Sequence, residues 1–322
     1  MQTFLVTGGA GFIGSHLCNS LIEQQHKVIN IDNFVPFYDP QIKNNNVKSL
    51  INHKEYELYR LDIRDKIGLE KVFKQHKIDI VIHLAAMAGV RPSIENPILY
   101  EEVNVQGTIN ILDCMKAYGV PKLVFGSSSS VYGNCDFTHP FNEDQPLGPL
   151  ISPYAITKKS AEDYCKLYHQ LYHINTIALR FFTVYGPGQR PDLAIHKFTK
   201  MISDDQPIPF YGDGTSIRNY SYVDDIVNGI NLSIQYLNKN KDIYEVINLS
   251  GDRSVTLKEV LTLIEEGLGK KALVIQLPNQ PGDVSGTNAD LCKARKLLGY
   301  FPRTSFEEGI KNFIRWFKKN NE

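Results

Sequence analysis

Short apolar runs alternate with longer segments of helical period along the first half of the chain. The runs are TFLVT (3–7), KVINI (27–31), DIVIHLA (79–85) and KLVFGS (122–127), and the segments between them include SHLCNSLIEQ and NVQGTINILDCMKAYG. Apolar runs of this length rich in Val, Ile and Leu predict buried strands, whereas apolar residues three and four positions apart predict helices. Strands that alternate with helices predict an α/β fold, a doubly wound parallel sheet with helices on both faces.

The pattern changes after the strand-like run INTIALRFF (174–182). Loops rich in Pro and Gly follow, namely YGPGQRPD, QPIPFYGDG and NQPGDVSG, and the helical segments between them include LAIHKFTKMISDD and VDDIVNGINLSIQYL. We therefore expect residues 1–175 to form mainly a nucleotide-binding domain and residues 176–322 mainly a smaller C-terminal substrate-binding lobe, with the chain crossing between the two. Clefts between lobes commonly hold ligands.

Charge and cysteine usage narrow the function class. Among 322 residues, Lys plus Arg and Asp plus Glu each number 35, so no net field favours nucleic acid or an anionic membrane surface. Five scattered cysteines without CxxC spacing argue against a disulfide framework and a zinc site, and the histidines show no metal-ligand spacing. No apolar run approaches the roughly 20 residues that span a bilayer, and MQTFLVTGG carries no basic segment before its apolar stretch. We expect a cytoplasmic protein that acts on a small molecule, without a metal.

A glycine-rich turn, GAGFIG (9–14), lies between the first predicted strand and the first predicted helix. Gly8, Gly11 and Gly14 let the backbone approach a diphosphate, which then rests on the amide groups of the helix N-terminus. The next predicted strand ends at Asp32, whose carboxylate can accept hydrogen bonds from the adenosine ribose and would repel a 2′-phosphate. This context predicts NAD rather than NADP as the cofactor; a turn that only packs strand against helix is the alternative.

A second constellation joins the hydroxyl cluster GSSSSVYG (126–133) to the predicted helix SPYAITKKSAEDYCKLYHQLY. Tyr154 and Lys158 are four residues apart and so share one helix face. A neighbouring ammonium and a positive nicotinamide would favour the phenolate form of Tyr154, which could then exchange a proton with a substrate hydroxyl held by one of the serines. A surface Tyr and Lys pair is the alternative.

The chain resembles the extended short-chain dehydrogenases/reductases that act on nucleotide sugars, through TGGAGFIGSH, HLAA, SSSSVYG, PYAITK and RFFTVYGPGQRP. Within that family, DNFVPFYDPQIK, AAMAGVRPSIENP and QPGDV are most similar to UDP-glucuronate 4-epimerases. The resemblance implies a Rossmann-type fold and NAD-dependent conversion of UDP-glucuronate to UDP-galacturonate. Tyr154 would remove the proton of the 4-hydroxyl while C4 passes a hydride to NAD, and the 4-keto sugar would turn over before the hydride returns to its other face.

The resemblance also implies roles for individual residues. Ser128, Tyr154 and Lys158 would be catalytic, and Thr183 and Arg190 would lie at the sugar carboxylate. The predicted cofactor-binding residues are Gly8, Gly11, Phe12, Ile13, Gly14, Asp32, Asn33, Asp62, Ile63, Leu84, Ala85, Ala86, Asn104, Tyr154, Lys158 and Phe181. The predicted substrate-binding residues are Arg91, Ser128, Ser129, Ser130, Thr183, Arg190, Phe210, Tyr211, Arg218 and Asp283.

Several of these assignments have open alternatives. Asp62 could be a solvated loop residue, Arg91 a loop ion pair, Arg190 a surface residue, and Phe210 and Tyr211 part of a lobe core. Gln280 stands where many relatives have a diphosphate-binding arginine, which leaves that task to Arg218.

Rival activities remain as well. UDP-glucose or UDP-N-acetylglucosamine 4-epimerisation is the nearest. Dehydratases and decarboxylases of this family carry acidic residues where this chain has Ser129 and Ser130, which favours the epimerase. A non-enzymatic NAD-binding protein would not need Tyr154 or Lys158. The family also implies a homodimer, paired through a four-helix bundle built from YCKLYHQLY and INILDCMKAY; burial of these helices inside the monomer is the alternative.

Overall fold

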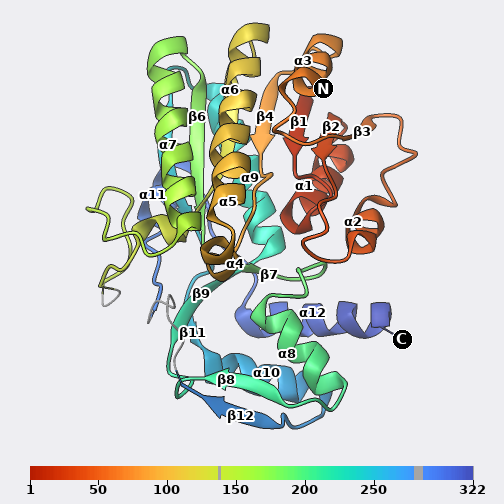
Figure 1. Cartoon of the computed structure of the whole chain (residues 1–322), viewed down its shortest axis with the longest axis vertical. Coiled ribbons are helices and arrows are strands. Elements are labelled where there is room, and N and C mark those ends of the chain that lie inside the picture. Colours follow the sequence, from red (N-terminus) through yellow and green to blue (C-terminus); the bar gives the residue numbers. More distant parts are fainter. Residues whose placement is uncertain (137–138, 279–285, 322) are drawn as a thin grey trace.

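A seven-stranded parallel sheet forms the centre of the larger lobe in a computed structural model that describes residues 1–136, 139–278 and 286–321 (Figure 1). The strand order is β10-β6-β5-β4-β1-β2-β3. The bounds are β1 (Thr3–Thr7), β2 (Lys27–Asp32), β3 (Tyr56–Arg60), β4 (Ile80–His83), β5 (Lys122–Ser128), β6 (Asn175–Phe181) and β10 (Tyr244–Leu249). Because β1 pairs with both β2 and β4, the strand order reverses there, and ligands of such sheets bind at the carboxyl ends beside this reversal.

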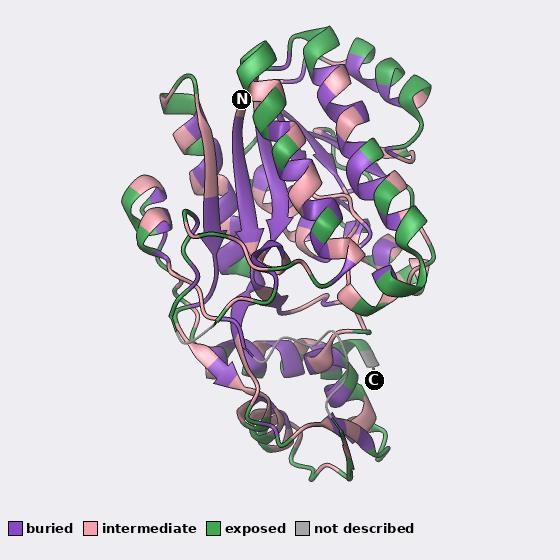
Figure 2. Ribbon diagram, turned by 60° about the vertical axis from the view of Figure 1, so that its left-hand side comes forward, coloured by how far each residue is buried: buried purple, intermediate pink, exposed green. Residues whose placement is uncertain are grey.

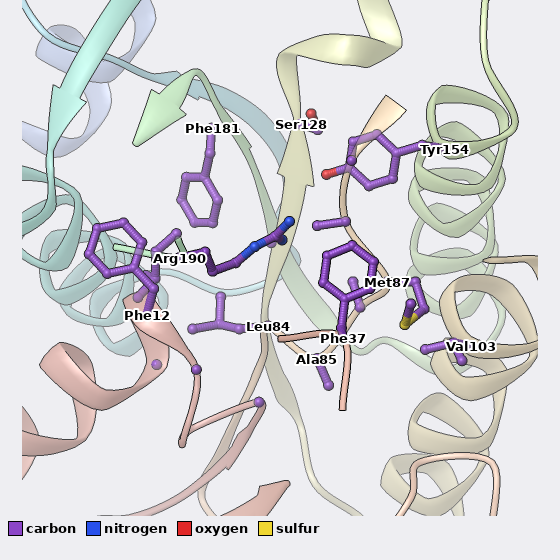
Figure 3. Close-up of a pocket in the computed structure, with 18 of the residues that line it drawn as sticks. Phe12, Phe37, Leu84, Ala85, Met87, Val103, Ser128, Tyr154, Phe181 and Arg190 are labelled. Carbon is purple, nitrogen blue, oxygen red and sulfur yellow. The ribbon is translucent and has the colours of Figure 1, made fainter. Parts of the chain in front are cut away.

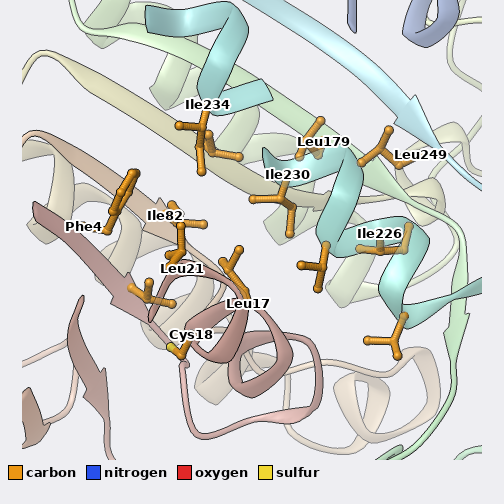
Figure 4. Packing of buried hydrophobic residues seen from close by; sticks show 14 of the residues in the cluster. Phe4, Leu17, Cys18, Leu21, Ile82, Leu179, Ile226, Ile230, Ile234 and Leu249 are labelled. Atoms are coloured by element: carbon orange, nitrogen blue, oxygen red, sulfur yellow. The ribbon is translucent and has the colours of Figure 1, made fainter. Parts of the chain in front are cut away.

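Helices cover both faces of the sheet, as the sequence pattern predicts. One face packs against α1 (Phe12–Glu23), α9 (Val223–Lys239) and α11 (Cys292–Leu298), and the other against α3 (Lys66–Gln75), α6 (Gly107–Tyr118) and α7 (Pro153–Tyr172). Figure 4 shows the first core, in which Leu17 and Leu21 of α1 meet Ile230 and Ile234 of α9 over the sheet. The predicted Rossmann-type α/β fold is therefore confirmed.

Within the described residues, the smaller lobe contains two short sheets and three helices. The sheets are β11 (Ser254–Thr256) with β9 (Ile217–Tyr222) and β7 (Thr183–Tyr185), and β12 (Val274–Leu277) with β8 (Ile208–Tyr211). The helices α8 (Ala194–Ser203), α10 (Leu257–Leu268) and α12 (Phe306–Asn321) enclose a core of its own. Figure 2 shows buried strands at the centre of the larger lobe and exposed outer faces on its helices.

The chain passes between the two lobes more than once. The larger lobe also contains elements from residue 175 onward, namely strands β6 and β10 and helices α9 and α11. The division into residues 1–175 and 176–322 therefore remains a prediction, and it says only which part of the chain forms most of each lobe.

The remaining short elements connect the strands around the carboxyl edge of the sheet. They are α2 (Pro40–Val47), α4 (Val90–Glu95), α5 (Pro97–Glu101), the π-helical turn η1 (Glu102–Gln106) and the 3-10 turn η2 (Ser129–Tyr132). No helix in the described part of the chain is both long and apolar enough to cross a membrane.

Candidate active site

A cavity of about 500 Å³ lies at the carboxyl ends of β1, β2, β4, β5 and β6 (Figure 3). Its size is typical of small-molecule sites, which occupy about 300 to 1,000 Å³. The predicted residues that line it are Gly8, Gly11, Phe12, Ile13, Gly14, Asp32, Asn33, Ile63, Leu84, Ala85, Ala86, Ser128, Ser129, Ser130, Tyr154, Lys158, Phe181, Thr183 and Arg190. The glycine turn and the serine and tyrosine constellation, far apart in sequence, thus share one cavity.

The glycine turn is shaped for close approach of a ligand to the backbone. Gly8 has a φ of +73°, and a Cβ built on Gly14 would lie 2.2 Å from the Gly8 carbonyl oxygen. The N-cap of α1 is Gly11, with no side-chain hydrogen bond to the first helical turn and no acidic residue in it. The amide groups of this helix end therefore have the geometry that a diphosphate needs.

Asp32, at the end of β2, is the buried acidic residue beside this turn. Its carboxylate accepts hydrogen bonds from the amides of Phe34 at 2.9 Å and Ala10 at 3.2 Å, and from the Lys43 ammonium at 3.0 Å. Lys43, which the sequence interpretation missed, supplies the opposite charge that a buried carboxylate requires. The glycine cradle, the helix end and this carboxylate are the groups that hold the adenosine and diphosphate of a dinucleotide, so the residues present fit NAD.

Tyr154 lies in the first turn of α7, where its position is set by local sequence. Ser152 caps the helix by accepting a hydrogen bond from the amide of Ala155 at 3.1 Å, and Pro153 is the first helical residue. In Figure 3 the phenol points toward Ser128, whose side chain is in turn 3.2 Å from that of Ser130. Burial raises the pKa of Tyr154, while a hydrogen bond with Ser128 and the positive charge of Arg190 act in the other direction.

Lys158 is buried one helical turn further along α7. Its ammonium donates to the Gly126 carbonyl at 2.7 Å, at the end of β5, and lies 5.1 Å from the centre of the Phe125 ring. Burial lowers the pKa of Lys158 to about 8, against the opposing influence of Cys165 and Glu162. Arg190 is a second cation of the cavity, besides Lys158, and its positive charge acts to lower the pKa of Tyr154.

Arg190 reaches into the cavity from the loop between β7 and α8. Its Nε donates to Asp192 Oδ1 at 3.0 Å and its Nη2 to Asp192 Oδ2 at 2.6 Å. The guanidinium carbon lies 4.9 Å from the centre of the Phe37 ring. Thr183, the first residue of β7, lines the same cavity, so the two residues assigned to a sugar carboxylate face a common space.

Two predicted cofactor-binding residues, Asn104 and Asp62, do not line the cavity but form hydrogen bonds with residues that do. Asn104, buried in η1, accepts from the amide of Met87 at 2.8 Å and donates to the Met87 carbonyl and the Thr157 hydroxyl. Asp62 is held by Arg64 and Asn33; although partial burial acts in the other direction, their hydrogen bonds lower the pKa of Asp62 to about 2.

The remaining predicted substrate residues lie toward the smaller lobe. Phe210 is buried in the core of that lobe, and Tyr211 lies under the Arg91 guanidinium, whose carbon is 5.4 Å from the ring centre. Arg218 on β9 donates to the Ile217 carbonyl at 2.8 Å. Asp283 lies outside the described residues. Of the described residues among them, Arg91, Phe210, Tyr211 and Arg218 are not part of the cavity lining around Tyr154.

The sequence interpretation missed a group of lining residues from one loop. Phe37, Tyr38 and Lys43 all come from the segment between β2 and the middle of α2, and Asp192 follows Arg190. The segment DNFVPFYDPQIK carried a signal, since it was one of the stretches most similar to the 4-epimerases, but no single residue in it was assigned beyond Asp32 and Asn33.

Comparison with known proteins gives consistent relatives over the whole chain. A family model described as GDP-mannose 4,6 dehydratase matches residues 5–313. A UDP-glucuronate 4-epimerase from Thermodesulfobacterium geofontis is 41% identical, covering 100% of this chain and 98% of its own length. The Bacillus cereus UDP-glucuronic acid 4-epimerase, solved with UDP-glucuronic acid and NAD, superposes with a TM-score of 0.93 at 36% identity, covering 99% of this chain and 100% of that one.

A Thermotoga maritima UDP-glucose 4-epimerase, solved with UDP-glucose, superposes with a TM-score of 0.90 at 33% identity and full coverage of both chains. The architecture is thus shared by enzymes whose sugars differ in the C5 substituent. The glycine turn, Asp32 and the tyrosine helix all lie within the matched residues 5–313. The chain therefore belongs to the GDP-mannose 4,6 dehydratase family of extended short-chain dehydrogenases/reductases.

Proposed function

We propose that this protein is an NAD-dependent UDP-sugar 4-epimerase that interconverts UDP-glucuronate and UDP-galacturonate through a transient 4-keto sugar. The observation that carries the proposal is the joining, in one cavity, of a dinucleotide cradle with a partly buried phenol, its serine partner and an arginine. Similarity to 4-epimerases of UDP-glucuronate over the full length of the chain supports the choice of reaction.

The residues would divide the work as follows. Gly8, Gly11 and Gly14 hold the diphosphate of NAD, and Asp32 holds the adenosine ribose. NAD supplies the acceptor for a hydride from C4 of the sugar and the donor that returns it to the opposite face. Tyr154 takes the proton of the 4-hydroxyl and gives it back.

Three groups assist the phenol in that task. Ser128 orients the sugar oxygen through the hydrogen bond that it shares with Tyr154, and Arg190 favours the ionised phenol. Lys158 anchors the end of β5 through the Gly126 carbonyl, which keeps Ser128 beside the helix that carries Tyr154.

The carboxylates of the cavity argue for epimerisation over elimination. Among the described lining residues they are Asp32 and Asp192, and each is already paired with a cation, Lys43 and Arg190 respectively. Ser129 and Ser130 line the cavity without an acidic neighbour of this kind. A dehydratase needs an acid and a base at C5 and C6, so this lining supports a reaction that leaves the sugar's atoms in place.

A direct assay tests the proposal. Purified protein with UDP-glucuronate and NAD, but no added reductant, should yield UDP-galacturonate, identified by anomeric NMR. Tyr154→Phe should retain NAD binding and lose turnover, because the phenol oxygen that exchanges the proton is gone. Rapid turnover of UDP-glucose with none of UDP-glucuronate would reject the assignment of Thr183 and Arg190 to a carboxylate.

We propose further that the enzyme is a cytoplasmic homodimer that binds neither nucleic acid nor membranes. Exposed apolar side chains on the outer face of the predicted bundle support the dimer: Ile156, Leu167 and Leu171 of α7 are 48%, 42% and 56% exposed, and lie on one side of that helix. The five cysteines are free thiols, which suits a reducing compartment. Light scattering at micromolar concentration measures the mass, and two chains per particle are expected.

A further inference from the structure

Arg190 donates two parallel hydrogen bonds to Asp192, and this fork uses only one edge of the guanidinium. An arginine side chain carries five N–H groups: one on Nε and two on each Nη. The hydrogen bonds described for this guanidinium engage Nε at 3.0 Å and Nη2 at 2.6 Å, both with Asp192. The end edge, formed by Nη1 and the second hydrogen of Nη2, keeps the parallel N–H geometry that a carboxylate accepts in a bidentate pair.

Arg190 and Asp192 both line the cavity, and the end edge is the edge of the guanidinium that Asp192 leaves open for a ligand there. In Figure 3 the Arg190 side chain crosses the cavity with its guanidinium on the side of Tyr154 and Phe37. The positive charge of Arg190 acts to lower the pKa of Tyr154, in keeping with a guanidinium that faces that phenol. The Asp192 side chain is 43% exposed, whereas that of Arg190 is 16% exposed, so the anion lies on the solvent side of the cation.

The Phe37 ring restricts the same guanidinium from a different direction. Its centre is 4.9 Å from the guanidinium carbon, a distance at which cation and ring attract each other. Phe37 therefore limits movement of the guanidinium toward the ring, while the fork to Asp192 limits its rotation. An arginine held in both ways loses little further freedom when a ligand binds its end edge.

We propose that Asp192 is a positioning residue that sets the sugar specificity of this site. By holding the Nε edge of Arg190, it presents the end edge to the C5 substituent of the sugar, where a carboxylate is bound in a bidentate pair and a hydroxymethyl group is not. The proposal rests on the proposed function, because it takes a UDP-sugar as the ligand of the cavity. It adds a residue that does not touch the sugar and yet decides between two sugars.

Asp192 could instead compete with the sugar for Arg190, and that role predicts the opposite change in sugar specificity. If Asp192 competed with the substrate carboxylate for Arg190, removing it would free the arginine and raise the preference for UDP-glucuronate. If Asp192 positions the arginine, removing it leaves the guanidinium free to turn, and the preference falls. The sign of the change in specificity therefore separates the two.

The experiment compares Asp192→Ala and Asp192→Asn with the unmodified enzyme, using UDP-glucuronate and UDP-glucose as separate substrates. The readout is a ratio: kcat/KM for UDP-glucuronate divided by kcat/KM for UDP-glucose. Hydrogen bonds to charged groups are each worth about 1.5 to 3 kcal/mol, or about 10- to 150-fold. We expect Asp192→Ala to lower the ratio by about tenfold or more through a higher KM for UDP-glucuronate. Asp192→Asn, which keeps the shape and one acceptor, should lower it less.

A matched control exists in the next helix. Asp204 pairs with Lys200 at 3.0 Å, and its side chain is 42% exposed, close to the value for Asp192, but it does not line the cavity. Asp204→Ala should leave the ratio unchanged. A general loss of stability would lower both kcat/KM values together and leave their ratio unchanged, so the ratio responds to specificity alone.

Failure of this inference and failure of the proposed function give different results. No conversion of UDP-glucuronate by the unmodified enzyme would reject the proposed function. If the unmodified enzyme converts UDP-glucuronate while both Asp192 variants keep or increase the ratio, the positioning role of Asp192 is overturned and the function stands.

Discussion

Burial of the Lys158 ammonium has a measurable effect on stability. The side chain is buried at the base of the cavity, and this burial lowers the pKa of Lys158 from 10.5 to about 8. A difference of about 2.5 between these pKa values corresponds to about 3 kcal/mol, since each tenfold change in proton affinity is about 1.4 kcal/mol. At neutral pH this burial should lower the free energy of unfolding by about that amount, because the folded state holds a charged ammonium in a site where a neutral group would be more stable.

The dependence on pH has a definite sign. Between pH 8 and 10.5 the unfolded chain keeps the proton on Lys158 while the folded chain releases it, so raising the pH favours folding. Below pH 8 both states are protonated and the cost is constant. Replacing Lys158 by Met removes this titration. Below pH 8 the free energy of unfolding of the variant should exceed that of the parent by up to about 3 kcal/mol, reduced by a constant amount for the lost hydrogen bond to Gly126. The gain should shrink steadily as the pH approaches 10.5.

Urea denaturation of the NAD-free protein at a series of pH values from about 6 to 10 measures this difference. Titrating groups that do not interact with Lys158 are common to both proteins, so they cancel when the two free energies of unfolding are subtracted; His83 and Cys165 do interact with it. Lys166→Met, on an exposed position of the same helix, controls for the change of residue type. A difference between Lys158→Met and the parent that stays constant over the whole range would refute the reasoning.

Three further predictions follow from named contacts. Gly14→Ala places a Cβ 2.2 Å from the Gly8 carbonyl oxygen, so the turn must shift and the NAD affinity measured by calorimetry should fall about 100-fold. Arg180→Gln leaves the buried Glu162 without the cation that now donates to it at 2.9 and 3.0 Å, and urea denaturation should show a loss of about 3 to 5 kcal/mol. Leu171→Arg puts a charge on the exposed apolar face of α7, and light scattering should then find single chains; a stable dimer would place the interface elsewhere.

Local sequence signals were sufficient for strands β1, β2, β4, β5 and β6 of the sheet and for the two ends of the cavity, whereas no strand was predicted at β10. The strand ending at Asp32 and the helix carrying Tyr154 were recognisable because apolar periodicity and flanking caps act within a few residues. The strand β3 was harder to define, since most of its residues are only partly buried and YELYR shows no continuous apolar run. The π-helical turn at Glu102–Gln106 has no sequence signature of its own, so helical backbone that is continuous from Pro97 was expected only from Asn104.

The residues that sequence could not place are those positioned by tertiary contacts. Lys43 is eleven positions from Asp32 and meets it only because α2 folds back over the end of β2. The contact of Arg91 with Tyr211 joins the two lobes across 120 positions of sequence, which no local pattern encodes. The positive charge of Arg190 near Tyr154 was likewise not predictable, because the two residues are 36 positions apart in the sequence and come together only in the folded chain.

The central claim is that a hydride leaves C4 of a UDP-sugar and returns to the same carbon from the other side. UDP-glucuronate labelled with deuterium at C4 tests it most directly, with the product analysed by mass spectrometry and NMR. The account predicts UDP-galacturonate of unchanged mass that still carries the deuterium on the inverted C4. A product lighter by one water or one carbon dioxide, or an inverted sugar whose deuterium has exchanged with solvent, would contradict it.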